Sequence, residues 1–225
     1  MKKNLLFICV IAVALLVGMT SCKNNKKEEP NTKKEAYTLS AEEISEFQKS
    51  AVKLNFYDSG YYGSAAIDDC KGFETDFWFV TDGLQFGWND NDPVYTGTGE
   101  YISCFVISPE KCADLYPLPA EYPVKEHYVT GSVIGGWDVL VEEGLEADFQ
   151  QLDGTVVTVV EDDEVVRNEF VVGGSVKIAG SANESVMLMN FNTVDTDGTM
   201  RSRKYYFTGK STIVDREASY PKQED

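Results

Sequence analysis

The spacing of apolar residues predicts one helix near the start of the folded part of the chain. Four apolar residues recur there at helical intervals: Ile44, Phe47, Ala51 and Leu54. Ser40 precedes them and Glu43 follows Ser40 by three residues, which is the arrangement of an N-terminal capping box. We therefore expect a helix over residues 41–53, with residues 51–57 open to a second interpretation as the first strand.

Alternation with a period of two begins after this helix. Along residues 73–81, phenylalanine and threonine occupy one set of alternate positions, and the other set carries two acidic residues, a tryptophan and a valine. This pattern predicts a strand with one apolar face. The Asp82-Gly83 pair is a hairpin signal, so we expect residues 84–88 to turn back on this strand.

The rest of the chain contains short apolar and β-branched segments separated by Gly, Asn and Asp turns. These segments are residues 101–107, 155–160, 164–172, 175–179, 185–193 and 200–208. Residues 101–107 are apolar on both faces, as in a central strand. Residues 116–123 contain three prolines, which cannot donate to a ladder, so we expect an extended connection or an edge strand. Gly173-Gly174 is expected to separate two strands.

These elements favour an all-β fold. Strands at a spacing of roughly 8–12 residues are typical of a single antiparallel β-sandwich or up-and-down barrel, here with one short N-terminal helix. In the last strand, Arg203, Tyr205 and Phe207 share one face. No predicted helix separates consecutive strands, which excludes a parallel α/β sheet.

The N-terminus has the pattern of a secretory signal. Lys2 and Lys3 precede an uncharged apolar run over residues 5–17, and small residues then lead to Cys22. The apolar run is shorter than the roughly 20 residues that a membrane-spanning helix needs. We therefore expect residues 1–21 to be a removable signal peptide.

Two further segments follow. Residues 22–36 are charged and polar with almost no apolar residue, so they cannot bury enough surface to offset their ordering entropy and are expected to form a disordered spacer. Residues 37–225 are long enough for one β-rich domain with a core of its own.

The predicted cleavage site resembles a known processing motif. It reads Met19-Thr20-Ser21-Cys22, which is similar to the lipobox of Bacteroidetes-type lipoproteins. The resemblance implies that Cys22 is lipidated and anchors the chain to the outer membrane. Lys27–Glu29 also resembles the charged signal that sends some of these lipoproteins to the cell surface.

The domain itself has a weaker likeness to uncharacterised lipoproteins of this type over residues 55–215. It rests on Tyr61–Gly63, Leu115–Tyr122 and Gly174–Ile178. This likeness implies an all-β lipoprotein and brings no activity or site with it.

The charge balance excludes one class of partner. The chain carries 20 lysines and arginines against 37 aspartates and glutamates, for a formal net charge of −17. Removal of residues 1–21 deletes two lysines and no acidic residue, so the predicted mature charge is −19. Such a chain repels phosphate backbones, and we expect no nucleic acid partner.

The residue types that commonly carry catalysis or bind metals are sparse. His127 is the only histidine, and the sequence contains neither a Gly-x-Ser-x-Gly motif nor a Cys-x-x-Cys pair. Cys104 and Cys112 are close enough in sequence for a small disulfide loop, whereas the apolar neighbours of Cys104 favour a buried thiol. We expect no catalytic residue, metal site or cofactor.

Acidic and aromatic residues provide the remaining candidates for cation or ligand binding. Two acidic pairs, Asp90/Asp92 and Asp195/Asp197, occur in turn-like segments. Each pair either stabilises a turn or forms a weak cation site. The second pair resembles part of a calcium loop but lacks the glutamate that such a loop requires. Trp88 and Trp137 adjoin Gly, Asn or Asp, which makes both rings candidates for ligand contact.

Three functions agree with these features. The first is a lipid-anchored, monomeric envelope lipoprotein that acts as a non-enzymatic binding or surface interaction module for a glycan or protein. The second is a glycan-acting hydrolase that uses a carboxylate pair. The third is a lipocalin-like carrier of a small apolar ligand.

Overall fold

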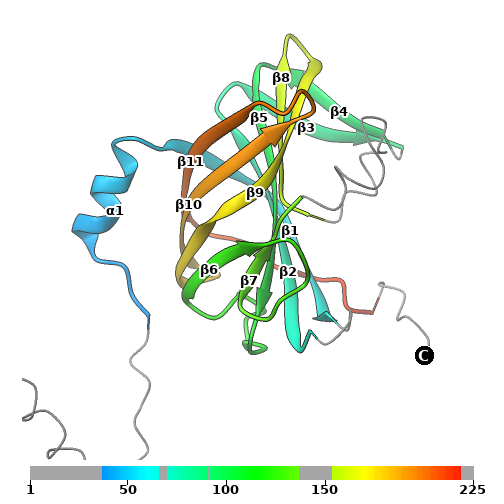
Figure 1. Cartoon of the computed structure of the whole chain (residues 1–225). Helices are drawn as coiled ribbons and strands as arrows, with labels where there is room; N and C mark the ends of the chain where they lie inside the picture. The colour runs from blue at the N-terminus through cyan, green and yellow to red at the C-terminus, as the bar shows by residue number, and fades with distance from the viewer. Residues whose placement is uncertain (1–36, 66–69, 91, 137–153, 219–225) are drawn as a thin grey trace, which may run out of the picture. The chain divides into compact units, whose positions relative to one another are not determined.

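The computed structural model describes residues 37–65, 70–90, 92–136 and 154–218. The predicted signal peptide, Cys22, the spacer and Trp137 lie outside these ranges. Among the described residues the protein is an all-β fold with one short helix, as the sequence predicts (Figure 1). No helix in these ranges is long and apolar enough to cross a membrane.

The helix and strands follow one another along the chain in a simple order. The first part contains α1 (Ala41–Gln48), β1 (Val52–Ala65), β2 (Gly72–Thr81), β3 (Leu84–Asn89), β4 (Asp92–Gly97) and β5 (Gly99–Ser108). The second part contains β6 (Ala120–Lys125), β7 (Ser132–Ile134), β8 (Val156–Glu161), β9 (Glu164–Ser181), β10 (Glu184–Asp195), β11 (Met200–Gly209) and β12 (Val214–Asp215).

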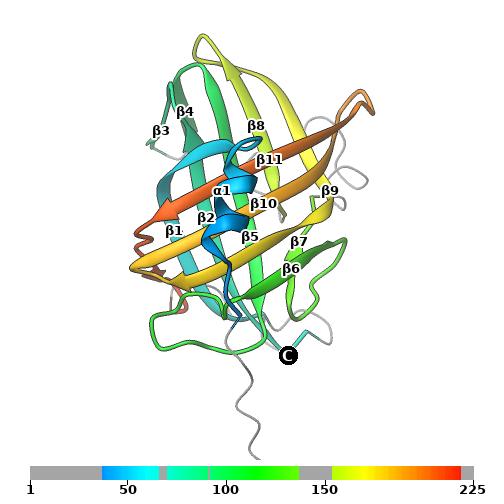
Figure 2. The same ribbon diagram turned by 90° about the vertical axis from the view of Figure 1, so that its left-hand side faces the viewer.

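The main sheet closes on itself as a barrel. Its ring runs β1-β2-β5-β8-β9-β10-β11 and returns to β1, with neighbours in chain order (Figure 2). All neighbours in the ring are antiparallel except β11 and β1, which pair in parallel at Val52 and Tyr205. The up-and-down barrel is therefore the better of the two predicted architectures, and its closing pair departs from pure antiparallel pairing because the ring has an odd number of strands.

The short strands β6 and β7 complete the wall beyond β8. The first half of β9 pairs with β8, and its second half pairs with β6. The proline-containing stretch divides accordingly: residues 116–119 are a connection, and Ala120–Lys125 is a short strand. Gly173-Gly174 does not separate two strands, contrary to the prediction. The chain continues through it as β9, with a bulge opposite Asn192 and a φ of 105° at Gly174.

Two predicted boundaries also change. The helix ends at Gln48, and the alternative interpretation of residues 51–57 as strand is correct. The Ser40 hydroxyl caps the helix by accepting the Glu43 N–H at 3.1 Å, whereas the Glu43 carboxylate pairs with Lys177 at 2.6 Å. The second half of the predicted capping box is thus replaced by a contact that holds the helix on β9.

The prediction that the segment after Asp82-Gly83 pairs with the preceding strand is wrong. Strand β3 pairs with β4 instead of turning back on β2, and the two form a separate small sheet. Gly83 has a φ of 92°, and its carbonyl accepts the Thr98 N–H at 3.2 Å. This contact holds both ends of the hairpin at the barrel wall, so the hairpin leaves the main sheet.

Large apolar side chains fill the middle of the barrel. Those exposed by 5% or less include Leu54, Phe77, Phe79, Ile102, Met187, Met189, Phe191, Tyr205 and Phe207. At the end where β10 begins, Tyr116 from the connection after β5 packs edge-on against Phe77, and its hydroxyl lies 2.5 Å from the Ser185 hydroxyl. This packing weighs against the predicted carrier of an apolar ligand, because a carrier needs an internal cavity.

Candidate functional site

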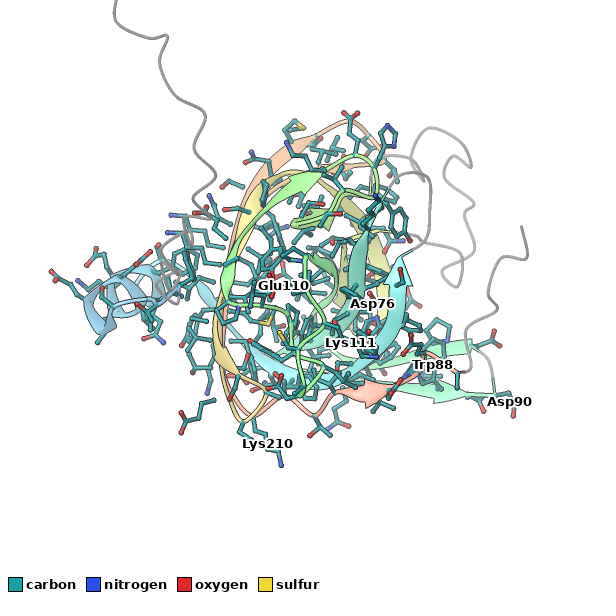
Figure 3. The ribbon with its side chains drawn as sticks, turned by 90° about the horizontal axis from the view of Figure 1, so that it is seen from below. Asp76, Trp88, Asp90, Glu110, Lys111 and Lys210 are labelled. Carbon is teal, nitrogen blue, oxygen red and sulfur yellow. The ribbon has the colours of Figure 1, made fainter. Side chains whose placement is uncertain are left out.

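The β3–β4 hairpin presents an aromatic face toward the outer wall of the barrel. Its register places Phe86 opposite Tyr95, and Trp88 opposite Pro93, on the same face. The Phe86 ring lies 4.4 Å from the ring of Tyr101 on β5. Figure 3 shows Trp88 and, beyond it, Asp90 toward the outer end of the hairpin. The inner half of this face is thus core, and its outer half extends past the wall.

Two exposed rings, Tyr57 of β1 and Trp88 of β3, pack on the buried Phe86, and we call these three rings the hairpin face. Trp88 lies edge-on to Phe86 with centroids 5.3 Å apart, and Tyr57 lies edge-on to the same ring at 4.9 Å. Phe86 is buried, whereas Trp88 is 53% exposed and Tyr57 is 37% exposed. A buried ring therefore fixes two exposed ones, which lowers the entropic cost of binding a ligand on them.

A cation from the C-terminal segment lies beside the hairpin face. The Arg216 guanidinium sits 5.3 Å from the Trp78 ring centroid, and its Nη2 lies 2.6 Å from Asp58 Oδ2. The Arg216 N–H donates to the Tyr61 carbonyl at 2.8 Å, which fixes the segment to β1. Trp78 also packs against the cluster that contains Phe86. The aromatic surface thus continues into an ion pair whose side chains are about one-third exposed.

The hairpin face offers polar groups next to its rings. Burial, with a smaller contribution from Asp58, raises the pKa of the Tyr57 hydroxyl, so this group remains a hydrogen-bond donor at neutral pH. The Asp58 carboxylate and the Arg216 guanidinium add planar acceptors and donors. Rings flanked by such groups suit ligands that have an apolar face and hydroxyls at the rim, such as sugars.

A second charged cluster lies inside the barrel and has a different character. Glu169 is 0% exposed and accepts hydrogen bonds from Arg203, Arg167 and Thr193, with Arg167 Nε and Thr193 Oγ1 each at 2.8 Å. Burial raises the pKa of Glu169, but these three donors outweigh it and hold the pKa below its ordinary value. Arg203 also reaches Glu100 at 3.0 Å. Each charge in this cluster is shared within the protein.

A shallow groove opens at the same end of the barrel. It has a volume of about 460 Å³ and lies between the first residues of β1 and β5 and the last of β2 and β8. Val52, Val159 and Val160 supply its apolar wall, and Glu100 is among its polar residues. Glu100 is already engaged by Arg203 and by the Tyr205 hydroxyl at 2.8 Å. The groove therefore offers a weaker recognition surface than the hairpin face.

Two carboxylates on β2 bear on the hydrolase alternative. Glu74 and Asp76 are alternate residues on one strand, so their side chains share a face and their Cα atoms are about 7 Å apart. That separation suits an inverting carboxylate pair, which spans about 6.5–9.5 Å. The two residues are only 6% and 3% exposed, however. Their burial weighs against direct access by a glycan.

The acidic pair at Asp195 and Asp197 forms a turn. The Asp195 carboxylate accepts the N–H groups of Asp197 at 3.1 Å and Thr199 at 2.8 Å, and it pairs with Arg201 at 2.6 Å. The hydrogen bond from Arg201 is the main cause that lowers the pKa of Asp195. These contacts account for the acidic residues without a cation. Across the described ranges, no group of three or more His, Cys, Asp or Glu residues is arranged to hold a metal ion.

The described cysteines are free thiols, so the disulfide between Cys104 and Cys112 does not form. Cys104 is fully buried, and burial raises its pKa, as expected for an unreactive core thiol. Cys70 and Cys112 are partly exposed.

The predicted ligand-contacting residues have different outcomes. Trp88 is exposed, as expected for such a ring, and Trp137 lies outside the described residues. The sequence analysis singled out neither Arg216 nor Tyr57. Asp90 and Asp92 lie at the outer turn of the hairpin, where Asp90 has a φ of 57°.

Comparison of the chain with protein families, with curated proteins and with solved structures gave no match. The geometry of the hairpin face is therefore the basis for a functional conclusion.

Proposed function

We propose that this chain is a lipid-anchored lipoprotein of the outer membrane whose barrel is a non-enzymatic binding module for glycans. The observation that carries the proposal is Trp88, a large ring that is 53% exposed yet fixed edge-on to a buried phenylalanine. An exposed ring held in one orientation can stack on the apolar face of a sugar. Tyr57 contacts the same Phe86 ring as Trp88, and Asp58, the next residue of β1, pairs with Arg216, so these three residues are the candidates for hydrogen bonds to the sugar hydroxyls.

The anchor is part of the same proposal. Lipid on Cys22 attaches the mature chain to the membrane, and residues 23–36 separate the barrel from it. Metabolic labelling with a palmitate analogue is expected to mark the wild-type chain and not the Cys22→Ala variant. Labelling of that variant, or its retention in the membrane fraction, would contradict the predicted anchor.

Glycan binding is tested with the full mature chain in detergent micelles. We expect isothermal titration to detect binding to at least one class of oligosaccharide, and Trp88→Ala to weaken it by at least tenfold. Met200→Ala is the matched control, because Met200 is 60% exposed and lies in β11, outside the hairpin face. Equal effects of the two substitutions would show that the hairpin face is not the site.

The same samples separate binding from hydrolysis. Mass spectrometry of each oligosaccharide after incubation is expected to show the intact chain. Cleavage that is lost in Glu74→Gln or Asp76→Asn would establish the hydrolase alternative instead.

A further inference from the structure

The two strands of the β3–β4 hairpin have different outer edges. The Thr98 N–H donates to the Gly83 carbonyl, so this pair is hydrogen-bonded across the hairpin. In an antiparallel pair every second residue is bonded in this way, and the residues between them direct their N–H and C=O groups away from the partner strand. By register, the outward groups of β3 therefore belong to Leu84, Phe86 and Trp88.

The outer edge of β4 is protected. Its outward groups belong to Pro93, Tyr95 and Gly97. Pro93 has no N–H to donate. The Gly97 N–H donates to the Asp163 carboxylate, and the Gly97 carbonyl accepts the Asp163 N–H at 3.0 Å. Proline and local contacts of this kind are the usual means by which proteins block an edge strand.

The outer edge of β3 has no such protection. None of the described strands pairs with it, because β3 and β4 form a sheet of their own (Figure 1). The strand Leu84–Asn89 contains neither a proline nor a charged residue, and Trp88 and Asn89 at its outer end are exposed. An edge strand with these properties can accept a further strand.

The surface beside this edge suits the side chains of an added strand. Strand β4 contacts β8, whereas β3 contacts β2 and β5, so the edge of β3 faces β1. Tyr57 of β1 is 37% exposed on that side, with its ring 4.9 Å from Phe86. In an added antiparallel strand, the residues that bond to β3 also direct their side chains toward the barrel. Apolar side chains at these alternate positions can cover Tyr57 and pack beside Trp88.

The charge around the edge indicates the other half of the partner's chemistry. Residues 72–110, which contain the hairpin and the strands on either side of it, include seven acidic residues and no lysine, arginine or histidine. Arg216, the cation beside the hairpin face, is paired with Asp58. A basic partner therefore complements this part of the chain, whose overall formal charge is −17.

We propose that the edge of β3 binds an extended basic segment of a partner protein by antiparallel strand addition. The segment alternates apolar residues, which face the barrel, with lysines or arginines, which face solvent. This inference goes beyond glycan binding and does not depend on it, because strand addition uses the backbone of β3, whereas the proposed glycan site uses the Trp88 ring.

The probe is an N-acetylated, C-amidated peptide, Lys-Val-Lys-Tyr-Lys-Val-Lys, titrated by calorimetry into the full mature chain in non-ionic detergent micelles. N-methylation of both valines removes N–H groups that face β3, so we expect it to weaken binding by about tenfold or more. N-methylation of the two central lysines is expected to change affinity by less than about twofold. The same peptide with glutamate at every lysine position is expected to bind about tenfold more weakly or worse.

Two substitutions of one residue provide the matched control in the protein. Trp88→Ala and Trp88→Pro both remove the ring, and only the proline also removes the outward N–H. Proline is tolerated in an edge strand, as at Pro93 directly opposite. Peptide affinity is expected to be about fivefold lower in Trp88→Pro than in Trp88→Ala. Glycan affinity is expected to be equal in the two variants.

The outcomes separate this inference from the proposed function. Equal effects of methylation on valines and lysines, or equal peptide affinity of the two variants, would overturn strand addition and leave glycan binding intact. Equal binding of the lysine and glutamate peptides would overturn the basic partner. A dimer of the chain that Trp88→Pro abolishes, without peptide binding, would assign the edge to a second copy instead. Peptide binding without binding of any glycan class would overturn the proposed function alone.

Discussion

Two arginine–carboxylate arrangements in this barrel differ in what their charges are available to do. Inside the barrel, Glu169 is 0% exposed and is shared by Arg203 and Arg167. On the outer wall, Arg216 and Asp58 are each about one-third exposed and lie against an aromatic surface. The inner charges pair with one another and stabilise the folded barrel, whereas the outer charges remain accessible to a ligand.

The difference matters because burial changes the cost of breaking each pair. A buried ion that loses its partner keeps its desolvation cost without compensation, whereas an exposed ion is taken over by water. An arginine–carboxylate pair is therefore expected to stabilise the fold at Glu169 and to be available for ligand binding at Arg216. Substitutions along this gradient of burial test that distinction.

The largest effect is expected at Glu169. Glu169→Ala leaves the guanidinium groups of Arg167 and Arg203 without their buried carboxylate, which is expected to lower the free energy of unfolding by about 3–5 kcal/mol. Urea unfolding of the full mature chain, followed by tryptophan fluorescence, measures this loss. Glu184→Gln, at an exposed residue of β10, is the control and is expected to change stability little. A loss below about 1 kcal/mol at Glu169 would show that its arginines are satisfied by water.

A smaller effect is expected on acidification. The hydrogen bonds to Glu169 hold its pKa below the ordinary value of 4.5, so the ionised form stabilises the folded state. This contribution is fully present above pH 4.5 and is lost as the pH falls through the lower pKa of the folded state. Unfolding curves between pH 6 and pH 3 are expected to show the loss in the wild type and a flatter profile in Glu169→Gln. Parallel profiles would assign the acid sensitivity to other carboxylates.

The sequence predicts the strands of this barrel better than the way the barrel closes. Alternation is a local signal, so β2 and β11 are recognisable, and Arg203, Tyr205 and Phe207 do share one face. The contact that closes the ring, between Val52 and Tyr205, joins residues far apart in the chain, and no local pattern encodes it. The departure of β3 from the sheet goes with a shorter-range contact, the hydrogen bond between Thr98 and Gly83 at the two ends of the hairpin, which the alternation along β3 does not encode either.

The two arginine–carboxylate arrangements could not be predicted from the sequence, for a related reason. A charged residue in a strand suggests a solvent-facing position, and only pairing shows that Glu169 points into the barrel with Arg203. The exposure of Trp88 was predictable because Gly, Asn and Asp around it indicate a turn. The contact of Arg216 with Trp78 was not, because the partners lie on separate segments with no shared periodicity.

An intermediate effect is expected for the outer pair. Arg216→Ala removes a cation–π contact and an ion pair that is about one-third exposed. Each contributes up to about 1 kcal/mol, so we expect a total loss of about 1 kcal/mol. Glycan affinity is expected to fall by about threefold, because the guanidinium borders the hairpin face. Urea unfolding and isothermal titration measure the two quantities. Arg216→Lys keeps the charge and is expected to retain most of the stability; an equal loss would assign the effect to packing of the planar group.

The smallest effect is expected at the most exposed pair, in α1. Lys49 and Glu46 lie 2.5 Å apart, but their side chains are 68% and 71% exposed. Glu46→Gln is expected to change stability by about 0.3 kcal/mol or less, because such helical pairs are weak and a negative charge near the helix C-terminus is itself unfavourable. Glu43→Gln is the matched control: it makes the same substitution in the same helix, and it breaks the less exposed pair with Lys177 that holds the helix on β9. If burial and tertiary contact determine how much each pair stabilises the fold, urea unfolding is expected to show a larger loss of stability for Glu43→Gln than for Glu46→Gln. Equal losses would mean that charge pairing itself stabilises this barrel, and the division between inner structural charges and outer accessible charges would not hold.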